Sequence, residues 1–386
     1  MVWEFRAPEV IVSGTGTFRG AGVLAAARGG RALIVSDPVM ERMGRVAQLS
    51  QMLQDAGVGA VSFTGVPGEP TDAMVAAGVA LAQREGCDLL VSLGGGSPMD
   101  TAKAIAMLAT NGGRITEYMG QDKVRLAALP HLAIPTTGGT GSEVTKFTII
   151  TDHASDVKML IGSPHLIPTV AIVDPELTLS APPRVTADTG VDALTHAIEA
   201  YISRKAQPMT DVLALSAIRL IAGNLRQAWA NGQDLAAREA VMMGAMQAGL
   251  AFTNASVALV HGMSRPIGAL FHVPHGLSNA MLLPTVMAYT WPACPQKFKA
   301  IAAAMGEPVD GLTPTAAAKV AVDAVRQLCQ DLQIPTIASF GIPAEQFMAV
   351  APKMAEDALI SGSPANNPRT PNREEITELY RAVLAM

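Results

Sequence analysis

The sequence predicts an α/β domain with a mostly parallel sheet, followed by an all-helical domain, and three features carry that prediction. In residues 1–180, short apolar runs alternate with amphipathic stretches, as in strands and helices that follow one another in a βαβ fold. Beyond residue 183, Ala, Leu and Met recur at helical spacing and strand-like runs are few. The proline-containing stretch at 180–183 separates the two patterns, so we expect domains at 1–180 and 181–386.

The individual elements follow from these patterns in chain order. Three apolar runs, 31–36, 88–93 and 131–135, are rich in Leu, Ile or Val and bounded by Gly, Pro or Asp, which predicts buried strands with helices on both faces of the sheet. Stretches at about 40–56 and 71–85 predict helices between the first two strands. In the second domain, helices are expected around residues 186–203, 208–229, 235–253, 298–305, 314–332 and 344–357.

The composition is that of a folded protein without a strongly charged binding surface. Hydrophobic residues make up 49% of the chain and charged residues 16%, which excludes intrinsic disorder. A formal charge of −5 gives no sign of a nucleic-acid or anionic-membrane partner. The three cysteines are scattered, the first residues lack a secretory pattern, and no apolar run reaches about 18 residues. We therefore expect a cytoplasmic protein that does not cross a membrane.

A glycine-rich loop, Gly94-Gly95-Gly96-Ser97, follows a predicted strand and leads into the helical stretch DTAKAIAMLAT. Glycines let a phosphate approach the backbone, and the free N–H groups at a helix start attract an anion. We expect Ser97 to cap this helix and Pro98 to suit its first position. The spacing matches neither a Rossmann GxGxxG nor a Walker A motif, and a tight structural turn explains it about as well.

A second loop, Pro135-Thr-Thr-Gly-Gly-Thr-Gly-Ser-Glu143, follows the next predicted strand and offers hydroxyls and amides to a ribose or phosphate. Since open α/β sheets bind ligands at the carboxyl ends of their strands, the two loops together favour a nucleotide. Asp37 ends an earlier strand and can accept hydrogen bonds from an adenosine ribose, which favours NAD over NADP. The alternatives are a flexible connection for the loop and a turn residue before Pro38 for Asp37.

Asp192 and His196 form the first half of a candidate metal site. They are spaced i, i+4 on a predicted helix, so both project from one face and can grip one cation. Asp188 lies one turn earlier and can face the same way. An Asp–His pair alone is more often a hydrogen-bonded surface pair, so the interpretation depends on further donors.

The second half is a cluster in which three of the seven histidines fall within residues 261–275. His261 and His275 are separated by 14 positions that include Pro266 and Pro274, so the chain can fold back and bring both imidazoles to one point. With the first pair they would supply three nitrogens and one carboxylate oxygen. This donor set suits Fe²⁺ or Zn²⁺.

Over nearly its whole length the chain resembles the iron-containing (group III) alcohol dehydrogenases of the dehydroquinate synthase-like superfamily. The resemblance rests on GGGSPMDTAK, PTTGGTGSEVT, DTGVDALTHAIEAY, HGMSRPIGALFHVPHG and Asn367-Pro368-Arg369, in this order. It implies an NAD-binding α/β domain, a helical metal-binding domain, and reversible hydride transfer between NAD(H) and a small alcohol or aldehyde. The implied metal ligands, for Fe²⁺ or possibly Zn²⁺, are Asp192, His196, His261 and His275. The implied cofactor-binding residues are Asp37, Gly95, Gly96, Ser97, Asp100, Thr136, Thr137, Thr140, Thr145 and Lys158.

One position departs from the pattern of that family. Many members carry a histidine of a proton path where this chain has Arg265, whereas this chain has His272 seven residues later. His272 would then relay the proton, or the proton would leave through the cofactor ribose and water. Arg265 would bind an anionic group of the substrate, because guanidinium pairs bidentately with carboxylate, or it would pair with a nearby acid.

These features leave three alternatives to a plain alcohol dehydrogenase. They are a reductase of a small anionic aldehyde of the semialdehyde type, a glycerol dehydrogenase-like polyol oxidoreductase, and an NADH-binding sensor without turnover. The expected partner is a small alcohol or aldehyde, and the resemblance implies a homodimer or larger homo-oligomer.

Overall fold

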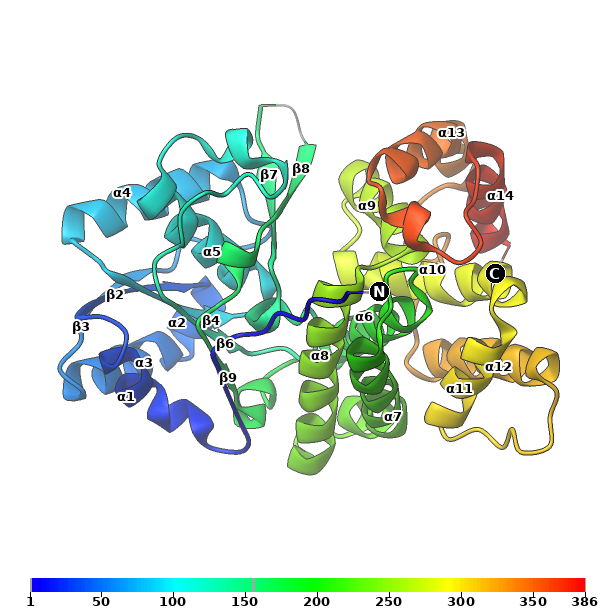
Figure 1. Cartoon of the computed structure of the whole chain (residues 1–386), viewed down its shortest axis with the longest axis horizontal. Coiled ribbons are helices and arrows are strands. Elements are labelled where there is room, and N and C mark those ends of the chain that lie inside the picture. The colour runs from blue at the N-terminus through cyan, green and yellow to red at the C-terminus, as the bar shows by residue number, and fades with distance from the viewer. Residues whose placement is uncertain (1, 155–156, 386) are drawn as a thin grey trace. The chain divides into compact units, whose positions relative to one another are not determined.

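The computed structural model describes residues 2–154 and 157–385 (Figure 1). The chain divides into two compact units, Arg6–Ser180 and residues 181–385, and residues 2–5 belong to the second unit. The first unit is built on a parallel sheet and the second is helical, which confirms the predicted fold class. The sequence pattern gave no reason to separate residues 2–5 from the first domain; in the structure, Gln207 Nε2 donates to Glu4 O at 3.0 Å and ties them to the helical unit.

The first unit contains a six-stranded parallel sheet with the strand order β1-β9-β6-β4-β2-β3. In its centre, Leu33 lies opposite Leu90 and Val91 opposite Leu132. The three predicted strands are confirmed as β2, β4 and β6, with β4 shifted by one residue. The strands are β1 (Val10–Ser13), β2 (Arg31–Ser36), β3 (Gly59–Phe63), β4 (Leu89–Gly94), β6 (His131–Pro135) and β9 (Val170–Val173).

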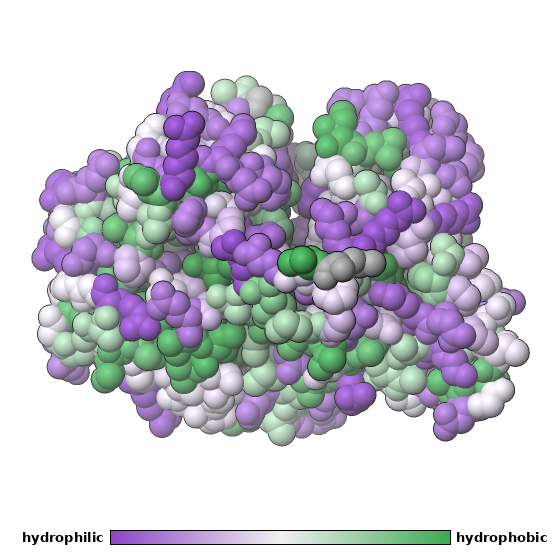
Figure 2. Space-filling view, viewed as in Figure 1, coloured by the Kyte–Doolittle hydropathy of each residue, from purple (hydrophilic) through white to green (hydrophobic). Residues whose placement is uncertain are grey.

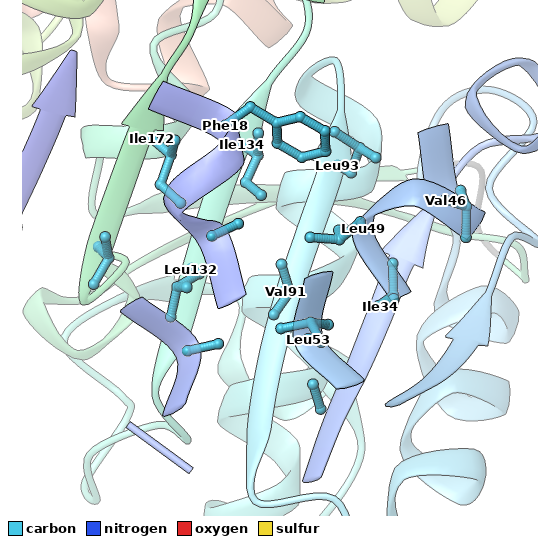
Figure 3. Close-up of a cluster of buried hydrophobic side chains, with 14 of the residues drawn as sticks. Phe18, Ile34, Val46, Leu49, Leu53, Val91, Leu93, Leu132, Ile134 and Ile172 are labelled. Atoms are coloured by element: carbon cyan, nitrogen blue, oxygen red, sulfur yellow. The ribbon is translucent and has the colours of Figure 1, made fainter. Parts of the chain in front are cut away.

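Alternate residues of these strands pack into two hydrophobic cores, one on each face of the sheet. On one face, Ile34, Val91 and Leu132 pack with residues of α1 (Ala21–Ala26) and α3 (Arg45–Asp55) (Figure 3). On the other face, Leu33 and Leu90 pack with residues of α4 (Asp72–Glu85) and α5 (Gly96–Asn111). Because successive side chains of a strand point to opposite faces, burial on both sides requires nearly continuous apolar runs, and these are the runs seen in the sequence.

Helices connect these strands, and one predicted helix is divided in two. The predicted helix at 40–56 breaks at Gly44, which adopts a left-handed φ of 73° as the N-cap of α3. The predicted helix at 71–85 is confirmed as α4, with Thr71 as its N-cap. The helices of this unit are α1 (Ala21–Ala26), α2 (Pro38–Arg42), α3 (Arg45–Asp55), α4 (Asp72–Glu85) and α5 (Gly96–Asn111).

The first unit also holds a three-stranded sheet, of order β5-β8-β7, that we did not predict from the sequence. β7 (Phe147–Asp152) and β8 (Val157–Gly162) are antiparallel, and β5 (Gly120–Gln121) pairs parallel with β8. Buried and less buried residues alternate along β7, as in a strand with one solvated face. This weaker pattern does not produce the continuous apolar runs by which the other strands were identified.

The second unit is helical throughout the part that the structure describes. The six predicted helices are confirmed as α6, α7, α8, α11, α12 and α13, whereas α9, α10 and α14 were not delimited from the sequence. The helices are α6 (Pro183–Ile202), α7 (Pro208–Ala230), α8 (Leu235–Ala255), α9 (Leu259–Phe271), α10 (His275–Thr290), α11 (Pro295–Ala304), α12 (Pro314–Asp331), α13 (Ala344–Ile360) and α14 (Arg373–Leu384). Short 3₁₀ helices cover Thr17–Gly20, Ile115–Tyr118, Ser142–Val144, Pro164–Leu166, Pro175–Thr178, Trp291–Ala293 and Ser363–Asn366.

The surface carries some large hydrophobic side chains. The face drawn in Figure 2 mixes hydrophilic and hydrophobic residues, and large exposed apolar side chains such as Val23, Val212 and Ile360 belong to different helices. Among the described residues, no helix is by itself long and apolar enough to cross a membrane; α8 and α9 together pass that test by length and composition, but they are bent by 102°.

Candidate active site

Four donor side chains of the second unit come together on three helices. Asp192 and His196 lie one turn apart on α6, His261 lies near the start of α9, and His275 begins α10. One ligand atom from each lies within 4.8 Å of the other three. Three of the side chains are buried, and His275 is half-buried. The structure therefore brings together the four residues that the sequence analysis singled out.

The chain returns to this site between α9 and α10, not at Pro266. That proline lies inside α9, so the expectation that it would help to turn the chain is wrong. The helix continues to Phe271, and the turn is made by residues 272–274. Gly276 then allows α10 to approach α6 closely, because a Cβ there would come within 2.8 Å of Asp188 O.

The protonation of the histidines suits metal binding. Both Nδ1 of His261 and Oε2 of Glu199 lie in the protein interior, 2.7 Å apart. A carboxylate accepts hydrogen bonds, so Nδ1 carries the proton. Nε2 then presents its lone pair toward the ligand atoms of the other three candidate metal ligands. Burial lowers the pKa of His275 to about 3 and that of His261 well below its usual value. Neutral imidazole is the form that coordinates a metal.

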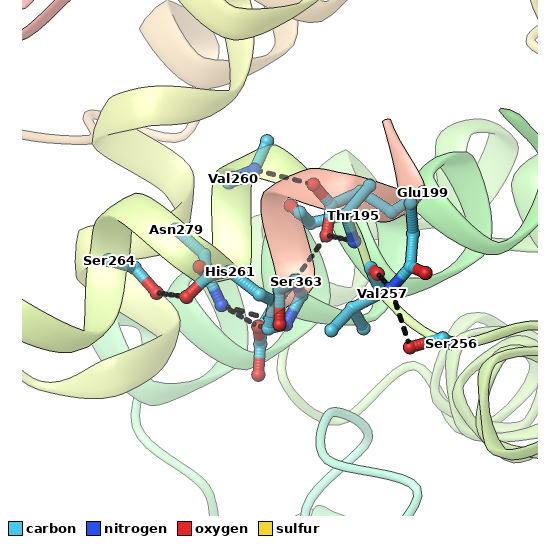
Figure 4. A network of polar contacts seen from close by, with 12 residues as sticks. Thr195, Glu199, Ser256, Val257, Val260, His261, Ser264, Asn279 and Ser363 are labelled. Carbon is cyan, nitrogen blue, oxygen red and sulfur yellow. Dashed lines mark hydrogen bonds and ion pairs between the residues drawn. The ribbon is translucent and has the colours of Figure 1, made fainter. Parts of the chain in front are cut away.

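The side chain of Asn279 shows where the lone pairs converge. Its Nδ2 donates to Asp192 Oδ1 at 2.7 Å and lies 3.1 Å from His261 Nε2 and 3.3 Å from His275 Nε2. Figure 4 labels Asn279 and His261 of this group. The Oδ1 of Asn279 is buried without a hydrogen-bond partner among the described residues. Three acceptors thus point to one small region, and three nitrogens with one carboxylate oxygen suit Fe²⁺ or Zn²⁺. The residues present fit a divalent metal ion.

Two residues of this site were missed in the sequence. Glu199 lies three positions after His196 on the same helix, and Asn279 lies four positions after His275. Helical spacing from the proposed ligands was the signal that could have identified both. Asp188 does not join the donor group and instead forms an ion pair with Arg184.

The loop after β4 fits a phosphate group at Gly95. Gly94 adopts φ 153°, and a Cβ on Gly96 would come within 2.8 Å of Thr140 Cγ2, so backbone conformation and packing explain these two glycines. Gly95 has an ordinary φ of −75°, and its Cβ would meet nothing closer than Thr137 Oγ1 at 3.7 Å. The protein itself does not require glycine there. A glycine there leaves room for a ligand to approach the start of α5.

The start of α5 differs from the sequence expectation. Gly95 is the N-cap and Gly96 the first helical residue, so the expectation that Ser97 caps the helix and Pro98 is its first residue is wrong. The extended backbone of Gly95, with ψ −161°, starts the helix earlier than a serine cap would. The N-cap side chain supplies no acceptor, which leaves the N–H groups of the first turn to an anion.

Buried polar residues attach the second loop to α5. Lys103 is 1% exposed, and its Nζ donates to Thr145 Oγ1 at 3.0 Å and to a carbonyl of β7 at 2.9 Å. Burial lowers the pKa of Lys103 to about 8. Asp100 accepts from Ser142 Oγ at 2.6 Å and from Ile149 N at 2.9 Å. The resemblance implies cofactor contacts for Asp100 and Thr145, whereas in the structure their oxygens bond within the protein and hold this loop in place.

The remaining predicted cofactor residues are distributed around these loops and on β8. Asp37 Oδ1 caps α2 by accepting from two of its N–H groups, and Oδ2 lies 2.9 Å from the position of a Cβ on Gly94. The N–H of Thr136 donates to Gly94 O at 2.9 Å, which joins the two loops. Lys158, on β8, forms an ion pair with Glu69 at 2.6 Å.

Arg265 and His272 lie at different places on α9. Arg265 follows His261 by one turn, and its Nη1 donates to Ser363 Oγ at 3.0 Å. Its Nε is buried without a hydrogen-bond partner, and it forms no ion pair, within the described part of the chain. Burial lowers the pKa of Arg265. His272 is exposed and ends α9 in a left-handed conformation with φ 53°, so it does not join the buried donors.

Comparisons with known proteins agree with this geometry. Residues 8–175 match the family model described as iron-containing alcohol dehydrogenase, and residues 186–384 match that of the Fe-containing alcohol dehydrogenase family, C-terminal. The chain is 43% identical to a 1,3-propanediol dehydrogenase of Citrobacter freundii over 92% of its length and 91% of that protein. It is 39% identical to an NAD-dependent methanol dehydrogenase of Bacillus methanolicus over 99% and 100%.

Solved structures give the same result. A 1,3-propanediol oxidoreductase superposes with a TM-score of 0.96 at 40% identity and covers 99% of this chain and 100% of its own. A sulfoacetaldehyde reductase from Bifidobacterium kashiwanohense, in complex with NAD⁺, superposes with a TM-score of 0.88 at 28% identity and covers 100% of both chains.

Proposed function

The chain belongs to the iron-containing alcohol dehydrogenase family and is an NAD-linked oxidoreductase of small alcohols and aldehydes, and from this premise we propose which residues carry the reaction. Asp192, His196, His261 and His275 hold the metal ion, and the loops after β4 and β6 hold NAD. The observation that carries this assignment is the convergence of four donor atoms within 4.8 Å of one another. The reaction converts an alcohol and NAD⁺ into an aldehyde, NADH and a proton.

The chain contributes binding, orientation and exclusion of water. When bound, the divalent cation supplies Lewis-acid chemistry and NAD supplies the hydride acceptor. Asp192 and the three imidazoles hold the cation, and burial keeps His261 and His275 neutral, so their nitrogen lone pairs are available for binding. The uncapped start of α5 binds the pyrophosphate at Gly95, Gly96 and Ser97, with Thr136, Thr137 and Thr140 beside it.

The proton of the substrate hydroxyl has to reach solvent. We assign this step to His272, which is exposed and lies in the segment that leads to His275. The Arg265 guanidinium holds its own proton and does not accept another. His272→Ala is expected to lower kcat with the metal content unchanged. An unchanged kcat would assign the proton to the cofactor ribose and water instead.

The substrate class is that of small alcohols and aldehydes. The named relatives act on 1,3-propanediol and methanol, and this supports a substrate of one to four carbons for this chain. A glycerol dehydrogenase-like activity on polyols is the related alternative within the superfamily. A cytoplasmic location and a homodimer or larger homo-oligomer complete the proposal.

The test is an NADH-oxidation assay on protein reconstituted separately with Fe²⁺ and with Zn²⁺, using neutral aldehydes of two to four carbons. Wild-type protein is expected to bind one metal per chain and to turn over. His261→Ala is expected to lose metal and activity while circular dichroism stays unchanged. A metal-loaded, active His261→Ala variant would refute the ligand assignment, and NADH binding without turnover of any aldehyde or polyol would indicate a sensor.

Arg265 favours a second candidate, reduction of an anionic aldehyde. Arg265 is half-buried, and its buried, unbonded Nε–H is costly unless an anion completes its hydrogen bonds; a guanidinium pairs bidentately with carboxylate or sulfonate. The likeness to a sulfoacetaldehyde reductase supports this candidate.

The test of this candidate compares 4-oxobutanoate with butanal in wild type and Arg265→Met. Loss of a charge-assisted bond is worth about 1.5–3 kcal/mol, so kcat/KM for the anionic aldehyde should fall about 10- to 150-fold while that for butanal changes little. Equal losses on both aldehydes would make Arg265 a structural residue.

A further inference from the structure

The carboxylate of Glu199 joins two parts of the metal site that lie far apart in the sequence. Glu199 is on α6, two turns after Asp192 and one after His196, so all three project from the same face. Its side chain is 1% exposed and reaches the start of α9, about 60 residues later in the chain. A buried carboxylate is retained in a fold only where donors compensate the loss of hydration, so its partners define its role.

Three N–H donors compensate it, and all of them belong to the start of α9. Oε2 accepts from Ala258 N at 2.8 Å and from His261 Nδ1 at 2.7 Å, and Oε1 accepts from Val260 N at 2.5 Å. Figure 4 labels Glu199, Val260 and His261 of this group. The N-cap of α9, Ala258, has no side chain that could cap the helix. The carboxylate of a different helix therefore takes the place of the cap, at the end of α9 where its dipole is positive.

The segment between α8 and α9, residues 256–258, has a strained backbone that other residues have to hold in place. Ser256 has φ 66° and ψ 164°, a conformation that non-glycine residues seldom adopt and that costs about 1–3 kcal/mol. Asn366 Nδ2 donates to Ser256 Oγ at 3.1 Å and to Val257 O at 3.0 Å. Such a conformation persists only where surrounding contacts impose it, and Glu199 supplies the contacts on the side of His261.

We propose that Glu199 is the positioning residue of the metal site: it fixes the tautomer and the ring orientation of His261 and holds the strained start of α9 against α6. This inference rests on the proposed function, because it takes His261 as a metal ligand. Because Glu199 holds the proton on Nδ1, the unprotonated Nε2 faces the other three proposed metal ligands. Outer carboxylates of this kind orient ligating histidines and raise their basicity, and their removal costs about 10- to 100-fold in metal affinity.

The test is the metal dissociation constant of Glu199→Gln, measured by competition with a chromophoric chelator. Gln has the same shape but lacks the charge, and one of its two terminal groups can only donate, so it cannot accept from all three N–H donors. The dissociation constants for Zn²⁺ and Co²⁺ are expected to rise about 10- to 100-fold, and the visible absorption of bound Co²⁺ should change because the geometry of one ligand is altered.

Thr195→Val is the matched control. Thr195 is fully buried on the same helix beside His196, and among the described residues its hydroxyl bonds only locally, to Val191 O at 2.8 Å. This variant perturbs the interior of α6 but keeps the Glu199 carboxylate that bonds to His261, so its dissociation constants should stay within about threefold of the wild type. Equal losses in Glu199→Gln and Thr195→Val would overturn the positioning role and leave only a general effect on the helix.

A further variant covers the case in which Glu199→Gln does not fold. Glu199→Asp keeps the charge but is one methylene shorter, and it is expected to fall between the wild type and Glu199→Gln in metal affinity. Wild-type affinity in Glu199→Gln, or in Glu199→Asp where Glu199→Gln does not fold, would refute this inference alone. If the wild type itself bound no metal, or His261→Ala bound it as well as the wild type, the proposed metal site would fail instead.

Discussion

The first unit is expected to become less stable at low pH, because His131 takes up a proton in the unfolded chain but not in the folded protein. This residue begins β6, is 3% exposed, and has Nε2 2.7 Å from Ser92 Oγ on β4. Its Nδ1 is buried without a hydrogen-bond partner among the described residues. Burial, helped by the ammonium group of Lys103, lowers the pKa of His131 to about 3. The folded protein therefore keeps this imidazole neutral at pH values where the unfolded chain protonates it.

The magnitude follows from proton linkage. Above pH 7 both states are neutral at this residue, and the free energy of unfolding does not depend on its titration. Below the ordinary pKa of 6.5, the unfolded state binds a proton that the folded state does not, so stability falls with pH until the folded pKa of about 3 is reached. Between pH 8 and pH 5 the loss is RT ln(1 + 10^1.5), about 2 kcal/mol. Because pH 5 is well above the folded pKa, the unfolded value alone sets this figure.

The assay is hydrogen exchange of the β4 and β6 amides at pH 8 and pH 5, corrected for intrinsic exchange rates. His131→Gln keeps a group that can bond to the Ser92 hydroxyl but has no titrating imidazole. Between pH 8 and pH 5, the free energy of opening should therefore fall by about 2 kcal/mol less in this variant than in the wild type. His165→Gln, at an exposed position of the same unit, should behave like the wild type. If wild type and His131→Gln showed the same pH dependence, the reasoning would be refuted.

Three further predictions concern the first unit and the helical packing. Asp37→Asn keeps a good N-cap for α2 but removes the charge, so KM for NADP should fall relative to KM for NAD; an unchanged ratio would leave Asp37 only a cap. Gly95→Ala, at an ordinary φ, should raise KM for NAD about 10-fold or more with an unchanged melting temperature, since the methyl group would lie where the phosphate approaches; unchanged KM would contradict the phosphate assignment. Gly223→Ala, exposed in the middle of α7 with open space around its Cβ, should stabilise the protein by about 0.5–1 kcal/mol in urea unfolding, and a loss of stability would contradict the open space seen there.

Much of the architecture could be predicted from local patterns. Strands buried on both faces need nearly continuous apolar residues, and helices packed on one side need apolar residues at helical spacing, so β2, β4 and β6 and six helices of the second unit were found at nearly their observed bounds. The strands β7 and β8 escaped because a partly solvated antiparallel pair leaves only a weak alternation. The split between α2 and α3 escaped because it depends on one glycine conformation at Gly44.

The candidate site, like the fold, could be predicted from the sequence only in part. Asp192 and His196 are neighbours on one helix, so their spacing alone determined that they share a face, and the scarcity of histidine drew attention to His261 and His275. Only the tertiary structure decided that the chain returns at residues 272–274, and that it does so closely enough for four donors to meet within 4.8 Å.

The supporting contacts were decided by the tertiary structure as well. Glu199 meets His261, at the start of α9, across a separation of 62 residues, and Lys103 meets Thr145 across 42. Hydrogen bonds within a helix and side-chain periodicity involve residues a few positions apart, and they can therefore be predicted from the sequence. Contacts between distant segments depend on how whole helices and strands pack, and that packing decides which buried carboxylate orients a histidine and which lysine holds a loop.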